Sequence, residues 1–143
     1  MGAKHSVSVA GAVVREDGRV LVIRRHDNGA WEAPGGVLEL DETIETGLAR
    51  EIREETGIEA EPVSLTGVYK NMKLGVVALF FRCRPVGGTE TPSEETTEVR
   101  WILPAEVEAL MAPTMAVRLL DAFSFEGTPR LRAHDGVQLL GQN

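Results

Sequence analysis

The sequence of 143 residues contains one cysteine, few aromatic residues and fewer basic than acidic side chains. A single thiol, Cys83, excludes an intramolecular disulfide and is typical of a reducing compartment, so we expect a cytoplasmic protein. Lys and Arg number 15 against 22 Asp and Glu, and the net charge of −7 disfavours a nucleic-acid polymer as partner. Apolar runs of membrane-spanning length and a charged-then-apolar leader are both absent, so we expect no membrane partner.

The bulk composition is that of an ordinary globular protein. Hydrophobic residues make up 43% of the chain and charged residues 26%, which is enough apolar material to build a core at this length. We therefore predict a single domain over residues 1–143, with its core in about residues 6–123. The segment 124–143 has few apolar residues and no clear periodicity. We interpret it as a C-terminal tail that is either mobile or in contact with a partner.

The most informative stretch is Gly36–Ile58, which reads GVLELDETIETGLAREIREETGI. Apolar residues recur there at every fourth position and predict a helix over Thr43–Thr56. The apolar stripe consists of Ile44, Leu48 and Ile52. Gly57 follows the helix and provides the left-handed residue with which many helices end. Asp41 and Thr43 are the two candidates for the N-cap.

Three glutamates of this helix violate local preferences together. Glu51, Glu54 and Glu55 fall within about 100° of one another on the helix surface. Glu51 and Glu55 form an i,i+4 pair of like charges, and Glu54 and Glu55 lie in the last turn, where the helix dipole disfavours anions. A bound divalent cation is the simplest compensation, and carboxylate oxygens suit Mg²⁺ or Mn²⁺. The alternative is an acidic helix face that is merely solvated.

The spacing of the fixed residues favours the metal site. The stretch has a glycine, a glutamate after five further residues, and the sequence REIREETGI after seven more. This pattern resembles the signature of the Nudix hydrolases at every fixed position. Those positions are Gly36, Glu42, Arg50, Glu51, Ile52, Glu54, Glu55, Gly57 and Ile58. The resemblance, which covers about residues 6–123, implies an α/β fold of the Nudix type, an α/β/α sandwich with a mixed curved sheet.

The remaining chain reads as strands interleaved with short helices, which independently gives the α/β class. Alternating or apolar runs predict a hairpin of two strands around the Asp17-Gly18 turn, and three later strands, of which the most apolar is central. A bulge is expected at Gly67. Prolines at the first helical position predict two helices near the end of the core. The strands are 6–14, 19–25, 63–72, 74–84 and 98–103, and these helices are 104–111 and 113–123.

The resemblance also implies roles for individual residues. Glu51 and Glu55 are the chief metal ligands, Glu54 assists, and the Gly36 carbonyl is a further ligand. Alternatively, Glu51 is the general base. Arg50 orients the helix by pairing with a carboxylate, for which Glu42 is the candidate. One more carboxylate comes from the loop before the Trp101 strand, with Glu95 as first choice ahead of Glu94 and Glu98.

Candidate substrate contacts lie outside the helix. Arg24 and Arg25 end a strand where family members place an arginine that contacts phosphate, and alternation allows only one of them to reach the substrate. The alternative for both is a solvated strand end. Tyr69 and Trp31 are candidates to stack on a base, whereas Phe80 is better explained as a core residue.

The family chemistry is hydrolysis of a diphosphate bond in a nucleoside diphosphate linked to another moiety. We expect a Mg²⁺-dependent pyrophosphohydrolase acting on a nucleoside triphosphate or a related small nucleotide. The runner-up substrate is ADP-ribose or another nucleotide-sugar, and the alternative from another class is a nucleotide-sensing module without turnover. The motif that marks coenzyme A substrates and the one that marks NADH are absent. Thr114-Met115 stands where members that cleave oxidised purines place an asparagine. The family also suggests a homodimer.

Overall fold

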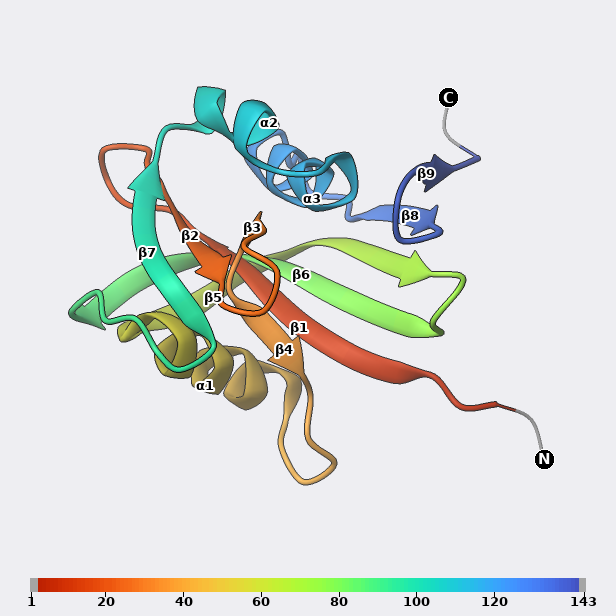
Figure 1. The fold of residues 1–143 in the computed structure, drawn as a ribbon, viewed down its shortest axis with the longest axis horizontal. Helices are drawn as coiled ribbons and strands as arrows, with labels where there is room; N and C mark the ends of the chain where they lie inside the picture. The colour runs from red at the N-terminus through yellow and green to blue at the C-terminus, as the bar shows by residue number, and fades with distance from the viewer. Residues whose placement is uncertain (1–2, 142–143) are drawn as a thin grey trace.

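A computed structural model describes residues 3–141. This part of the chain forms nine strands, three α-helices and one short 3₁₀ helix (Figure 1). The strands are β1 (Ser6–Val13), β2 (Val20–Arg25), β3 (Trp31–Glu32), β4 (Gly35–Val37), β5 (Ile58–Asn71), β6 (Val76–Gly88), β7 (Thr96–Ile102), β8 (Arg130–His134) and β9 (Leu139–Leu140). The helices are α1 (Ile44–Thr56), η1 (Pro104–Glu106), α2 (Val107–Leu110) and α3 (Pro113–Phe123).

The strands form two sheets. A mixed six-stranded sheet has the order β4-β1-β6-β5-β8-β9, and a three-stranded antiparallel sheet has the order β3-β2-β7. In the larger sheet, β1 runs parallel to β6 and antiparallel to β4, so that Ser8 lies between Ala78 and Val37. The apolar strand β6 lies inside this sheet, between β1 and β5, as its composition predicted.

Helices cover both faces of the strands, with α1 on one side and α2 and α3 on the other (Figure 1). The alternation of side chains along β1 produces this division. Val9 and Val13 pack with Leu48 and Ile52 of α1, whereas Ala12 belongs to the core cluster that includes α3. The chain therefore has the α/β/α layering and the mixed sheet that the sequence predicted.

The signature helix has well-formed ends. Thr43 is the N-cap, because its hydroxyl accepts a hydrogen bond from the Thr46 amide at 3.2 Å. Gly57 ends the helix in the left-handed region with φ 77°, and its amide donates to the Arg53 carbonyl. A Cβ at Gly57 would lie 2.2 Å from the Thr89 carbonyl oxygen, so both the conformation and the space require glycine.

Two predictions about strand pairing need correction. The predicted hairpin of the first two strands is paired next to its turn, by a bridge between Val14 and Val20 and a hydrogen bond from the Arg15 amide to the Arg19 carbonyl. Beyond that bridge, β1 enters the larger sheet and β2 the smaller one, because each strand is apolar on both faces and needs helices on both sides. Strand β5 also begins at Ile58, before the predicted start at residue 63. Its register against β6 shifts at three places, after Glu59, after Pro62 and just before Gly67, the predicted bulge.

The segment after Phe123 is also more ordered than the sequence indicated. Strand β8 pairs in parallel with β5, and β9 pairs with β8, so residues 130–140 extend the larger sheet. Side-chain contacts hold this segment to α3: Arg132 donates to both carboxylate oxygens of Asp121 at 2.7 and 2.8 Å. Polar contacts fix the segment, which explains why apolar periodicity did not detect it; residues 142–143 lie outside the described part.

No helix in residues 3–141 is long and apolar enough to cross a membrane.

Candidate functional site

A cavity of about 740 Å³ opens where β1 and β4 approach α1, α3 and the loop before β7. Its acidic residues are Asp27, Glu32, Glu51, Glu55, Glu94 and Glu95, and its basic residues are Arg25 and Arg118, with His26 beside them. Six carboxylates therefore face two guanidinium groups. Its volume is that of a pocket for a small molecule.

Gly36 lies close to the first of the helix carboxylates. A Cβ at this position would be 2.4 Å from Glu51 Oε2, so only a glycine lets the β4 backbone approach Glu51 this closely. The Glu51 side chain is 13% exposed, and burial raises its pKa, against the opposing effect of Arg50. The structure thus brings together the Gly36 backbone and a half-buried carboxylate, as the resemblance implies.

Glu55 is the most perturbed acid of the cavity. It is 8% exposed, and its Oε1 accepts a hydrogen bond from the Gly35 amide at 2.7 Å. Burial, opposed by the Gly35 hydrogen bond and reinforced by the charges of Glu51, Glu32 and Glu95, raises the pKa of Glu55 to about 8. The carboxylates that face the cavity therefore destabilise one another's charges, and a cation among them would relieve this repulsion.

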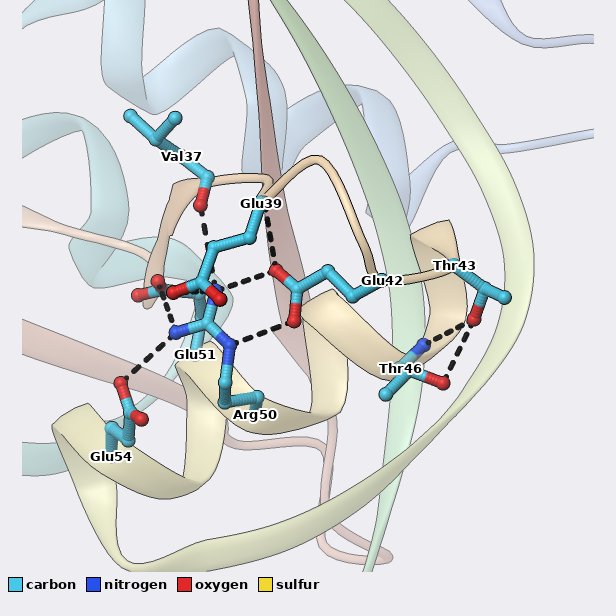
Figure 2. Close-up of polar contacts among 8 residues, drawn as sticks. All are labelled: Val37, Glu39, Glu42, Thr43, Thr46, Arg50, Glu51 and Glu54. Carbon is cyan, nitrogen blue, oxygen red and sulfur yellow. Dashed lines mark hydrogen bonds and ion pairs between the residues drawn. The ribbon is translucent and has the colours of Figure 1, made fainter.

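Arg50 links the signature loop, residues 38–43 between β4 and α1, to the helix α1 (Figure 2). Its Nε and Nη2 donate to the two carboxylate oxygens of Glu42 at 2.8 and 2.6 Å, the pairing that the sequence suggested. Its Nη1 donates to Glu51 at 2.9 Å and to Glu54 at 3.1 Å. The Arg50 guanidinium lowers the pKa of Glu42 to about 2. Arg50 thus donates hydrogen bonds to three carboxylates, forms a longer ion pair with Glu39 at 3.8 Å, and fixes the direction of the two carboxylates that belong to α1.

Glu54 differs from its two neighbours on α1. Its side chain is 56% exposed, and it is not among the residues that line the cavity. Its described contact is the ion pair with Arg50, at the outer edge of the network in Figure 2. The structure therefore places Glu51 and Glu55 in the cavity and Glu54 at its margin.

The three candidates for a further carboxylate separate in the structure. Glu94 and Glu95 line the cavity from the loop before β7, where hydrogen bonds between Ser93 and Thr96 hold the turn. Glu98 does not line the cavity; it lies on β7 between Arg24 and Arg100, at 3.8 and 3.3 Å. Geometry thus narrows the choice to two adjacent residues.

The two strand-end arginines also point to different places. Arg25 lines the cavity, where it pairs with Asp27 at 2.5 Å and with Glu32 at 3.3 Å. Arg24 donates to the Gly29 carbonyl and lies 6.0 Å from the ring of Trp31, outside the cavity. Alternation along β2 thus leaves Arg25 as the arginine that can reach a ligand.

The prediction that Tyr69 stacks on a base needs correction. It is 1% exposed, its hydroxyl donates to Asp121 at 2.7 Å, and its ring packs edge-on against Phe80. The side chain belongs to the core on the α3 side and does not line the cavity, so it cannot stack on a base there. Phe80, expected in the core, is indeed buried and also contributes to the cavity wall.

The sequence analysis missed three charged residues of the cavity, Asp27, Glu32 and Arg118. Glu32 follows Trp31 in the stretch WEAPGG of residues 31–36, and Arg118 is a lone arginine inside an otherwise apolar part of α3. A basic residue on the apolar face of a helix was the available signal for Arg118. No pattern in the sequence distinguished Glu32.

In their present positions, no three His, Cys, Asp or Glu side chains of residues 3–141 form a ready-made metal cluster. Glu51 and Glu54 are turned toward Arg50, and Glu55 toward the Gly35 amide. The donor types nevertheless suit a hard divalent cation, since the cavity offers several carboxylates and the backbone of Gly36 beside them.

Comparison with known proteins establishes the class. The family model described as the NUDIX domain matches residues 4–123, which is most of the chain. The chain belongs to the Nudix family and is a Nudix hydrolase. The crystal structure of a NUDIX hydrolase from Nitrosomonas europaea shares the fold, with a TM-score of 0.79 at 23% identity, over 94% of this chain and 82% of that one.

Curated relatives carry several names. A MutT-like protein from Streptomyces ambofaciens is 63% identical over 95% of this chain and 88% of its own length. A Bacillus subtilis (strain 168) protein with the provisional name 8-oxo-dGTP diphosphatase is 31% identical over 76% and 74%. An ADP-ribose pyrophosphatase from Methanocaldococcus jannaschii is 30% identical over 68% and 62%. These relatives support hydrolysis of nucleotide-linked substrates and differ in the substrate itself.

Proposed function

We propose that this protein hydrolyses a diphosphate bond of a nucleoside triphosphate or a related small nucleotide, and that the reaction depends on Mg²⁺ or Mn²⁺. The observation that carries the proposal is the charge of the cavity, in which six carboxylates face two guanidinium groups. A polyphosphate entering such a cavity would be repelled unless cations entered with it. A cavity of this composition suits a complex of metal and nucleotide.

Glu51, Glu55 and the Gly36 carbonyl are the ligands we assign to the cation, with Glu54 assisting from the margin and Glu95 from the opposite loop. A bound divalent cation would neutralise phosphate charge and acidify the attacking water. Glu51 and Glu54 each accept from Arg50 through one carboxylate oxygen, Oε1 of Glu51 and Oε2 of Glu54, so the other oxygen of each is not engaged by Arg50. Glu51 remains the alternative general base.

The positively charged residues position the carboxylates and the phosphate chain and take no direct part in the chemical step. Arg50 holds the signature loop to α1 through its paired bonds to Glu42 and thereby orients Glu51. Arg25 is the arginine of the cavity wall that can contact a phosphate, since Asp27 and Glu32 hold it at that wall. Both groups can favour an extended phosphate chain lying along the carboxylates.

Support for the substrate comes from two directions. The relative named as an 8-oxo-dGTP diphosphatase favours a nucleoside triphosphate, and the relative named as an ADP-ribose pyrophosphatase favours a nucleotide-sugar as second candidate. The position that carries an asparagine in purine-cleaving members is occupied by Thr114-Met115, and Met115 lines the cavity. This departure disfavours an oxidised purine as the base, so an ordinary nucleoside triphosphate or a related small nucleotide stays the first choice.

A product-resolved hydrolysis assay tests the proposal. NTPs, dNTPs, ADP-ribose, other nucleotide-sugars and dinucleoside polyphosphates are incubated with and without Mg²⁺, and kcat/KM is measured for each. We expect a triphosphate to be the best substrate and activity to vanish without the cation. Glu55→Gln should lower kcat/KM by more than about a hundredfold, because even the outer partners of metal ligands contribute about 10–100-fold.

Glu45→Gln is the matched control for that assay. Glu45 lies exposed on the same helix, away from the cavity, and should retain full activity. Full turnover by Glu54→Gln and Glu55→Gln together would contradict the metal-ligand assignment. Binding of nucleotides without any turnover would instead support a sensing module.

A further inference from the structure

The cavity has a second end, lined by small and apolar side chains. Along β1, Ser8 and Ala10 alternate with the valines that pack on α1, so these small residues face the α3 side. Ala78, the partner of Ser8 on β6, is also small, and Phe80 and Met115 complete this part of the wall. Small side chains beside larger apolar ones leave a slot between the sheet and α3, as a planar ring requires.

Arg118 enters this slot from α3 with its charge poorly matched. In residues 3–141, the carbonyl of Thr114 is the one oxygen that accepts from its guanidinium, at 3.3 Å, and no carboxylate forms an ion pair with it. The ring of Tyr69 lies 5.1 Å away, and burial lowers the pKa of Arg118. A partly buried arginine with a single long hydrogen bond to oxygen has donors available for a ligand.

The contact between Arg118 and His134 does not satisfy those donors. His134 is 2% exposed, and burial and the charge of Arg118 lower its pKa, so the ring is neutral. A neutral imidazole carries one N–H. The Gly136 amide donates to Nδ1 at 3.0 Å, which places the proton on Nε2. Nε2 therefore presents a donor to Arg118 Nη2 at 3.3 Å, and two donors face each other.

Glu32 supplies the complementary group in the same cavity. Its side chain is 21% exposed, and its Oε1 accepts from Arg25 at 3.3 Å. No donor among residues 3–141 bonds to its other oxygen, Oε2. Glu32 and Arg118 also attract each other electrostatically across the cavity. The slot thus presents a hydrogen-bond acceptor on one side and a donor on the other.

We propose that Glu32 and Arg118 select the base of the nucleotide, and that the base they select is guanine. Its Watson–Crick edge carries two adjacent donors, N1–H and N2–H₂, which suit the Glu32 carboxylate, and the acceptor O6, which suits Arg118. Adenine presents the unprotonated N1 to the carboxylate and its amino group to the guanidinium, so both contacts are repulsive. Uracil and thymine offer one N–H to Glu32 and form fewer bonds. This inference rests on the proposed nucleotide hydrolysis.

Base discrimination measured by kcat/KM tests the inference. Wild-type enzyme should prefer GTP over ATP by about tenfold or more, with ITP between them, because hypoxanthine keeps N1–H and O6 but lacks the N2 amino group. Glu32→Gln should lower the ratio of GTP to ATP by about tenfold or more, since the glutamine amide can donate to the unprotonated N1 of adenine and offers guanine one acceptor oxygen in place of two. Arg118→Lys should raise KM for GTP more than it lowers kcat, since Arg118 contacts the base and is not among the residues assigned to the cation or the phosphates.

Matched controls and a second readout separate the outcomes. Glu108→Gln and Arg53→Lys alter exposed residues outside the cavity and should leave the ratio unchanged. Calorimetric binding of GMP and AMP reports base selection without turnover, and melting curves verify that each variant folds. An unchanged ratio of GTP to ATP in folded Glu32→Gln and Arg118→Lys would overturn the base assignment while leaving the hydrolase proposal intact. Absence of hydrolysis by the wild type, with GMP still bound more tightly than AMP, would overturn the hydrolase proposal and leave the base assignment intact.

Discussion

Among individual residues, Glu55 shows most clearly how the fold would prepare the proposed cation site. The carboxylate is held by the Gly35 amide inside a cavity that contains other acids, and burial keeps its pKa near 8. A buried carboxylate without a cation tends to retain a proton, whereas a metal ligand must be ionised. The side chain is therefore poised to exchange a proton for a cation.

We predict proton release when the cation binds. At pH 7 Glu55 lies below its folded pKa of about 8, so Mg²⁺ binding should release close to one proton per ion, and the release should fall toward zero above pH 8. Titration calorimetry in two buffers of different ionisation enthalpy measures this number. Glu55→Gln is the control and should show little release. A release that does not vary with pH would contradict the assigned role.

At the scale of secondary-structure elements, the attachment of the signature loop to α1 positions the carboxylates of the cavity. The helix is stabilised at its ends by Thr43 and Gly57, and the loop is tied to it by Arg50 and Glu42. Glu42 also accepts from the Glu39 amide at 2.9 Å, so this carboxylate fixes the backbone of the loop as well. The loop therefore depends on a charged contact, and its stability should depend on pH.

Replacing Arg50 tests this dependence. Arg50→Met should lower the Tm at pH 7, because Glu42 loses its partner. The folded pKa of Glu42 is about 2 against an ordinary value of 4.5, so the stabilisation is complete above pH 4.5 and disappears as the pH falls toward 2. Thermal melts at several pH values should show the Tm difference from wild type narrowing over that interval. Arg53→Met, an exposed change on the same helix, should show no such narrowing.

The elements also show how far sequence patterns reach. The signature helix, the bulge at Gly67 and the helix that begins at Pro113 followed from periodicity, glycine and proline, which are local signals. The separation of β1 and β2 into two sheets and the addition of β8 did not follow, because both depend on contacts between distant segments.

The candidate site shows the same difference between local signals, which the sequence reveals, and contacts between distant segments, which it does not. The carboxylates of α1 share one helix, and their spacing alone placed them together. Glu32 and Arg118 come from different layers and meet only at the cavity, and Tyr69 was assigned to the ligand although the fold encloses it against Asp121. A sequence reveals residues that share an element far better than residues that share a cavity.

For the whole molecule, we propose that an acidic protein handles an acidic substrate through a divalent cation. The chain has a net charge of −7, and its cavity is acidic as well. Cation binding at the α1 carboxylates is thus the central claim, and the fold supports it by bringing together α1, β4 and the loop before β7.

Electron paramagnetic resonance of Mn²⁺ tests that claim most directly, because bound ion disappears from the signal of the free aqueous ion. With a non-hydrolysable nucleotide present, wild-type protein and Glu45→Gln should remove Mn²⁺ from this signal equally, whereas Glu51→Gln and Glu55→Gln should bind it at least about tenfold more weakly. Equal Mn²⁺ binding by all four proteins would contradict the account.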